Sequence, residues 1–190
     1  METSDHAGYI YDSWLASACM PSSTVLLLLQ HYNDAATVYE AVQHHDTDLA
    51  DLMPSRFCRI LQNNSSVHYL TAMKKKMAQY SIGVIRIHDD LYPDQLMDIS
   101  DPPALMFYRG DPKCLKNRIL SMIGSRSASY SGQKATAKLA EELSRKGISV
   151  VSGLACGIDA SAHRGCIDGG SPTIAVTGCG LDRIYPRDNM

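Results

Sequence analysis

Two turns that combine glycine, serine and arginine contain the residues of this chain best suited to binding chemistry. Each turn follows an apolar segment and precedes a helical pattern, so backbone amides, hydroxyls and a guanidinium gather at one point. That chemistry suits an anion, and two such turns side by side would suit a polyanion. The candidate residues are Gly124, Ser125, Arg126 and Ser129 in the first turn, and Gly153 and Gly157 in the second.

The first turn taken alone fits a second interpretation equally well, because a serine-rich loop with a surface arginine is a common connection. It is not a dinucleotide-binding fingerprint, since the Gly-x-Gly-x-x-Gly pattern is absent and Gly124 and Gly132 are too far apart to form it. It is not a Walker loop either. In open α/β sheets ligands bind beyond the carboxyl ends of the strands, where both turns are predicted to lie.

Asp159 and His163 follow the second turn on one face of a predicted helix. We predict that Asp159 caps this helix and that its carboxylate bonds the loop amides. For the two residues together we expect a helix-stabilising pair, and a histidine base held by a carboxylate is the alternative. No serine or cysteine nucleophile stands in a recognisable elbow, so no hydrolytic machinery is indicated.

A third turn, over residues 178–189, adds glycine flexibility and further candidate contacts to a nucleic acid. Arg183 and Arg187 supply positive charge. Tyr185 could stack on a base, although a tyrosine before proline is also a common packing device.

Strand and helix patterns alternate through the second half of the chain. Strands are predicted at residues 82–87, 104–108, 119–123, 148–151 and 173–176, and helices at 132–146 and 159–167. This order specifies an α/β fold with βαβ crossovers in a mostly parallel sheet, whose strands are covered by helices on both faces.

Residues 1–80 differ from the rest, because their apolar residues recur at spacings of three and four, with breaks at Pro21 and Pro54. This pattern predicts a small bundle of short helices. The turn at residues 20–24 could be a helix-hairpin-helix turn that touches DNA, but it lacks the glycine that brings amides close to a phosphate. We therefore favour a structural helical domain.

The composition sets broad limits: the 190 residues are 45% hydrophobic and carry a net charge of -2, which argues against indiscriminate binding to nucleic acid. The charge is uneven, with 8 Lys/Arg and 14 Asp/Glu before Lys116, and 10 and 6 from there onward. The six cysteines have no metal-binding or redox spacing, so we expect buried, reduced thiols, no metal site and no cofactor. Since neither a signal peptide nor a membrane-spanning run is present, we expect a cytoplasmic protein.

The ordered motifs together resemble the DNA-processing protein A family of bacteria, DprA or Smf. The matching runs are residues 90–96, 101–105, 124–126, 152–163 and 180–182, with Tyr185, Pro186 and Asn189. The resemblance implies a helical domain over 1–80, SAM-like or helix-hairpin-helix-like, and an extended Rossmann-like DNA-binding domain over 81–190. It implies a protein that binds and protects single-stranded DNA in natural transformation, helps to load the RecA recombinase and catalyses no reaction.

Carried over from the family, Gly124, Ser125 and Arg126 would contact DNA phosphate, and Ser129, Gly153 and Gly157 would support that surface. Three positions depart from the family pattern. Cys156 stands where arginine is usual, Ser131 where tyrosine is usual, and Pro172 where a lysine is frequent. Each change removes a DNA contact, so we expect a lower affinity than in other members.

Family members continue beyond Asn189 with elements that complete the sheet and commonly supply a dimer surface. We therefore expect the Rossmann-like part to be truncated, to leave an apolar edge or face exposed, and to form a weakened homodimer. Two alternatives stay open. One is a nucleotide-processing enzyme similar to the Rossmann-like phosphoribohydrolases, which Gly169 and Gly170 match only faintly, and the other is a non-functional fragment.

Overall fold

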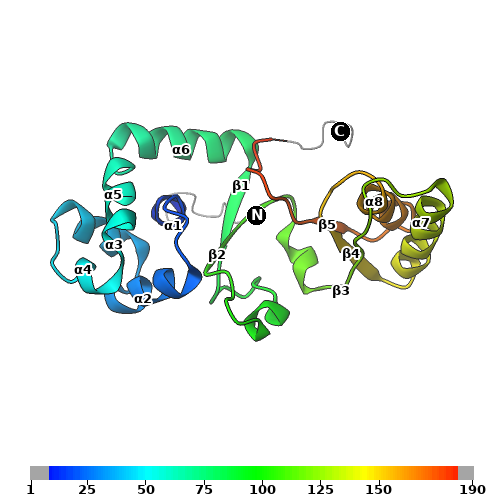
Figure 1. Ribbon diagram of the computed structural model, residues 1–190, viewed down its shortest axis with the longest axis horizontal. Coiled ribbons are helices and arrows are strands. Elements are labelled where there is room, and N and C mark those ends of the chain that lie inside the picture. Colours follow the sequence, from blue (N-terminus) through cyan, green and yellow to red (C-terminus); the bar gives the residue numbers. More distant parts are fainter. Residues whose placement is uncertain (1–8, 184–190) are drawn as a thin grey trace. The chain divides into compact units, whose positions relative to one another are not determined.

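The computed structural model describes residues 9–183 of the chain. Contacts divide the chain into two compact units, the first ending at Gly110 and the second beginning at Asp111. Figure 1 traces the elements of both. No helix in the described part is long and apolar enough to cross a membrane.

The first unit begins with a bundle of short helices, as the spacing of apolar residues predicts. The helices are α1 (Ile10–Ala16), α2 (Ser22–Tyr32), α3 (Ala35–Gln43), α4 (Leu49–Leu52), α5 (Ser55–Asn63) and α6 (Val67–Tyr80). Trp14 is fully buried, and its indole N–H donates to the carbonyl oxygen of Leu61 (3.2 Å), which ties α1 to α5. Because α2 and α5 begin directly after Pro21 and Pro54, the predicted breaks are confirmed.

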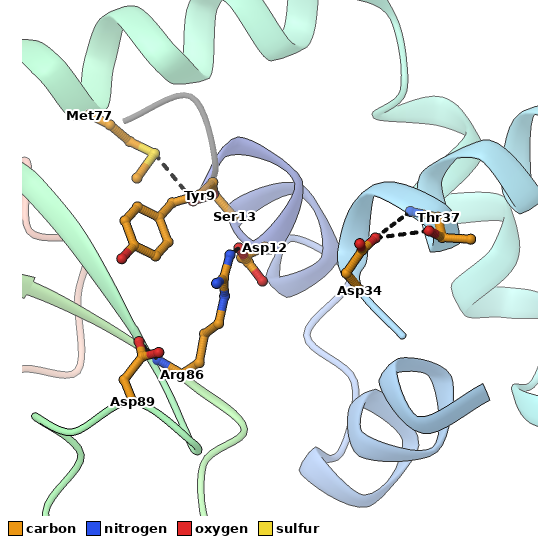
Figure 2. A network of polar contacts seen from close by, with 8 residues as sticks. All are labelled: Tyr9, Asp12, Ser13, Asp34, Thr37, Met77, Arg86 and Asp89. Atoms are coloured by element: carbon orange, nitrogen blue, oxygen red, sulfur yellow. Dashed lines mark hydrogen bonds and ion pairs between the residues drawn. The ribbon is translucent and has the colours of Figure 1, made fainter. Parts of the chain in front are cut away.

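An antiparallel hairpin completes the first unit. Its strands are β1 (Ile82–Arg86) and β2 (Leu105–Arg109), with the short 3-10 helix η1 (Asp94–Asp98) between them. Figure 2 shows the contact that joins the hairpin to the helices: Arg86 Nη2 donates to Asp12 Oδ2 of α1 (2.5 Å), and the guanidinium lies 4.9 Å from the centre of the Tyr9 ring. The hydrogen bond to Asp12 raises the pKa of Arg86 above its ordinary value.

The Arg86–Asp12 contact joins the hairpin to the helical part, and both lie in the first compact unit, which ends at Gly110. Asp12 is buried, so its carboxylate needs a charged partner, and β1 supplies one. The hairpin thus packs with the helical part. The assignment of residues 81–190 to one DNA-binding domain stays a prediction.

The second unit alternates strand and helix in the predicted order. After the 3-10 helix η2 (Pro112–Lys116) come β3 (Arg118–Ser121), α7 (Tyr130–Arg145), β4 (Ile148–Ser152), α8 (Ile158–Asp168) and β5 (Thr173–Ala175). The strands form a parallel sheet in the order β3-β4-β5, with β4 in the middle. The expected α/β class and parallel sheet are confirmed, and the element bounds differ from the predicted ones by at most two residues.

The core of the second unit lies between β4 and the two helices, which run side by side (Figure 1). Val150 of β4 packs there with Ala140, Ala162 and Cys166. Gly165 lets the helices approach closely, because a Cβ atom at this position would lie 2.1 Å from the Ala137 carbonyl oxygen.

Part of the apolar surface around the sheet is exposed. Ile123, just beyond β3, is 78% exposed, and Val176, just beyond β5, is 66% exposed. Within the described residues, the predicted helices on both faces of the sheet therefore leave Ile123 and Val176 uncovered.

The cysteines are unpaired, but the prediction that they are buried is wrong for five of the six. Cys166 alone is buried, against α7. Cys19 and Cys156 lie in turns between elements and Cys179 lies in the segment after β5, where the backbone itself stays near the surface.

Candidate anion-binding site

The two candidate turns meet at the carboxyl end of the sheet. The first, residues 122–129, leaves β3, and the second, residues 153–157, leaves the neighbouring strand β4; we call them the two anion loops. The Ile158 N–H donates to the Ser125 carbonyl oxygen (3.2 Å), and the Ser152 hydroxyl donates to the Met122 carbonyl oxygen (2.6 Å). The structure therefore brings Gly124 and Ser125 against the segment that begins at Gly153.

Glycine is required at two points of this contact. A Cβ atom on Gly124 would lie 2.7 Å from the Ile158 side chain, and one on Gly157 would lie 2.3 Å from the Ser125 carbonyl oxygen. Gly157 also has a φ of +81°, which side chains rarely adopt. The first loop thus packs against the Ile158 side chain at Gly124 and against the Gly157 backbone at Ser125.

Asp159, in the first turn of α8, fixes the shape of the second loop. Its side chain is 6% exposed, and Oδ2 accepts from the N–H groups of Gly153 (3.2 Å) and Ala155 (3.3 Å). The expected bonding of loop amides is confirmed, but the prediction that Asp159 is the N-cap is wrong, because α8 begins at Ile158 and its N-cap is Gly157. The carboxylate occupies two amides that an anion would otherwise use.

Several donors around the two loops have no acceptor within the described part of the chain. The Arg126 side chain is exposed and makes no hydrogen bond or ion pair there, and the N–H groups of Cys156 and Gly157 likewise donate to no acceptor. The Ser125 hydroxyl accepts from the Ser127 N–H (3.1 Å), which leaves its own proton to donate. A guanidinium, a hydroxyl and unpaired backbone amides are groups that can bind an anion.

Ser129 serves first as a helix cap. Its hydroxyl oxygen accepts from the Gly132 N–H (3.2 Å) at the start of α7 and lies 3.1 Å from the Ser131 hydroxyl. Ser129 thus sets the direction in which the first loop enters α7, and it remains exposed at the surface of that loop.

His163 does not pair with Asp159, so the expected helix-stabilising pair is wrong. The ring turns toward β5, where Nδ1 lies 2.7 Å from the Thr173 hydroxyl, which itself donates to the Val150 carbonyl oxygen (2.8 Å). Nδ1 must therefore carry the proton. Nε2 is buried without a partner in the described structure, and burial lowers the pKa of His163, against a smaller opposing effect of the Asp159 charge.

The third turn follows β5, and only its first part is described. Arg183 is exposed and makes no hydrogen bond or ion pair with the two anion loops in that part; its backbone N–H donates to the Gly180 carbonyl oxygen (3.0 Å). Tyr185 and Arg187 lie outside the described residues.

The positions that depart from the family pattern are all accessible. Cys156 in the second loop is partly exposed, and Ser131 and Pro172 are exposed. Among residues 9–183, no group of three or more His, Cys, Asp or Glu side chains is arranged to hold a metal ion.

Sequence reasoning missed two residues that shape the site. Ile158 lies under Gly124, and Leu154 adopts a left-handed φ of +58° in the middle of the second loop. The apolar residue directly after Gly157 could have indicated Ile158. No local sequence pattern indicates that a leucine will adopt a positive φ.

A family model described as DNA recombination-mediator protein A matches residues 83–190. The DNA processing protein DprA of Streptococcus pneumoniae is 44% identical over 103 residues, 54% of this chain and 36% of that protein. DprA of Bacillus subtilis is 36% identical over 131 residues, 67% of this chain and 44% of that protein. The chain spans less than half the length of these two relatives.

Solved structures give the same relationship. The X-ray structure of DprA from Streptococcus pneumoniae matches with a TM-score of 0.72 and 30% identity, covering 95% of this chain and 61% of that one. DNA processing protein A of Helicobacter pylori, solved for its single-stranded DNA binding mode, matches with a TM-score of 0.50 and 29% identity, over 59% of this chain and 49% of that one.

Proposed function

Because the chain belongs to the DNA recombination-mediator protein A family, we propose that it binds single-stranded DNA through the two anion loops and protects incoming strands in natural transformation. The observation that carries this proposal is that Arg126, whose side chain is exposed and unpaired in the described residues, has its backbone against Gly157, where a Cβ atom would lie 2.7 Å from the Arg126 carbonyl oxygen. The solved relative from Helicobacter pylori, which binds single-stranded DNA, supports the choice of ligand.

In this proposal the loops recognise phosphate and not base sequence. Ser125 and Arg126 donate to phosphate oxygens, and Gly124 and Gly157 let the two backbones come close enough to present their amides together. Ser129 and Gly153 support the surface by capping α7 and by joining the loop to Asp159. Binding then needs no catalytic step, and nucleoside monophosphates incubated with the protein should stay intact.

The proposal extends to two partners that the family resemblance implies. The bound strand would be handed to the RecA recombinase in the cytoplasm, and a second copy of this chain would form a weak homodimer. Sedimentation of the purified chain at several concentrations measures the dimer, and RecA filament formation on DNA pre-bound by this protein measures the transfer.

Titration of the Arg126→Ala variant with oligo(dT) at two salt concentrations tests the DNA-binding proposal. The variant should bind more weakly, and the slope of log affinity against log salt should fall by about 0.7, because one phosphate contact is lost from a single strand. Arg118→Ala is the matched control, since Arg118 is exposed at the opposite end of β3. Equal behaviour of the two variants would exclude Arg126 from the site.

A further inference from the structure

Tyr130 is the most exposed of the large hydrophobic side chains in the described structure, at 82%. It is the first residue of α7 and directly follows Ser129, so it stands where the first anion loop enters the helix. Exposing an aromatic ring to water costs free energy. Exposed rings are common where a protein stacks on the bases of a single-stranded nucleic acid.

Two lysines continue from Tyr130 along the same side of α7. Lys134 and Lys138 follow at intervals of four residues, which places all three side chains in one row. Both lysines are exposed, and neither has an acidic partner within residues 9–183. Since helical side chains lean toward the N-terminus, the row points back to the anion loop.

The row ends where acidic residues begin. Glu141 follows Lys138 and is ion-paired with Arg145, and Glu142 is exposed beside it. Lys134 and Lys138 therefore lie on the part of α7 that precedes its first acidic residue, Glu141. We call Tyr130, Lys134 and Lys138 the α7 stripe.

We propose that the α7 stripe is a second contact region for single-stranded nucleic acid, in which one base stacks on Tyr130 and the adjoining phosphates lie on Lys134 and Lys138. This inference rests on the proposed function, because the strand reaches the stripe from the anion loops. Four residues of helix rise about 6 Å, close to the spacing of successive phosphates in an extended single strand.

A single strand fits the stripe better than a duplex does. The faces of bases inside a duplex are covered by their neighbours, whereas an unpaired base can leave the stack and lie on an aromatic ring. The stripe thus combines a stacking platform with a short electrostatic track, and any base can occupy the ring.

The stripe is tested with two ligands of equal length, oligo(dT) and an abasic strand, at two salt concentrations. Tyr130→Ala should weaken binding to oligo(dT) by about tenfold, leave the salt slope unchanged and leave binding to the abasic strand unchanged, because only bases stack. Tyr130→Phe should retain wild-type affinity. The Lys134→Ala/Lys138→Ala variant should weaken binding to both strands and lower the salt slope by about 0.7 for each lysine.

Two substitutions on the same helix serve as controls. Leu139→Ala removes an exposed apolar side chain from another side of α7, and Lys146→Ala removes a charge at its far end. Neither should change affinity. Because Tyr130, Lys134 and Lys138 are exposed, the variants should unfold at the wild-type temperature, which circular dichroism checks.

The possible results separate the stripe from the proposed function. If Arg126→Ala weakens binding while the stripe variants keep wild-type affinity, the proposal for the α7 stripe is contradicted and the proposal for the anion loops is supported. If Tyr130→Ala weakens binding to oligo(dT) and to the abasic strand equally, stacking on Tyr130 is wrong. If the wild-type chain binds neither strand, both the proposed function and the proposal for the α7 stripe are contradicted.

Discussion

Gly157 and Ser125 are in direct backbone contact, although they belong to loops that leave different strands: a Cβ atom on Gly157 would lie 2.3 Å from the Ser125 carbonyl oxygen. The Ile158 N–H donates to that same oxygen (3.2 Å). The surface that presents Arg126 is therefore shaped by both loops together, and a change in one should alter the other.

Replacing Gly157 by alanine should destabilise the protein and weaken DNA binding. The substitution places a Cβ at a φ of +81° and against the Ser125 oxygen, so we expect a loss of unfolding free energy on the order of 2 kcal/mol or more. Gly170→Ala is a matched control, since Gly170 also has a positive φ (+94°) but nothing lies within 4 Å of its added Cβ. Urea unfolding and oligo(dT) titration measure both effects; equal losses for the two variants would mean that the loop contact contributes nothing.

Removing the Asp159 carboxylate should loosen the second anion loop. Asp159→Ala removes the carboxylate oxygen that accepts from the N–H groups of Gly153 and Ala155, and the loss of these hydrogen bonds to a charged group costs on the order of 2 kcal/mol. Asp159→Asn keeps a side-chain oxygen that can accept, so its cost should be smaller. Urea unfolding measures the free energy of unfolding of both variants. Equal values for Asp159→Ala and Asp159→Asn would contradict this role of Asp159.

The parts of the fold that depend on local spacing could be predicted from the sequence. Apolar runs and glycine turns locate β3, β4 and β5, and the parallel order then brings Gly124 and Gly153 to one edge of the sheet. The contacts that join distant segments could not be predicted. Nothing in the local pattern of β1 indicates that Arg86 pairs with Asp12, because that bond depends on how α1 packs.

His163 illustrates the same limit within the site. Its spacing from Asp159 is right for a helical pair, but the ring instead reaches Thr173 on β5. Helical spacing gives the residues that can meet on one surface of a helix, whereas the packing of α8 on the sheet decides which partner a buried ring takes.

A positive charge at position 156 should strengthen DNA binding. Cys156 lies between Gly153 and Gly157 in the second anion loop and is partly exposed, so the Cys156→Arg side chain can reach a bound phosphate. We expect tighter binding to oligo(dT) and a salt slope steeper by about 0.7. Cys19→Arg adds the same charge at an exposed cysteine of the helical unit and should leave both quantities unchanged; a similar gain there would show that net charge alone raises the affinity.

Acid should destabilise the second unit through His163, the one histidine in residues 111–190. Burial lowers the pKa of the folded imidazole below 6.5, and among the charged groups only Asp159, on the same helix, opposes this. The unfolded chain therefore binds a proton more readily than the folded one, so stability is full above pH 6.5 and falls as the pH drops from 6.5 toward the lowered pKa of the folded state.

The His163→Gln variant separates this effect from the titration of other groups. Glutamine can still donate toward Thr173 but takes up no proton, so the free energy of unfolding of the wild type should fall relative to the variant as the pH decreases below 6.5. Urea unfolding of both proteins at a series of pH values from 8 to 5 measures that difference, and a proton NMR titration of the ring reports its pKa directly. A constant difference across the series, or a ring that titrates at or above 6.5, would contradict the burial of a neutral His163 against β5.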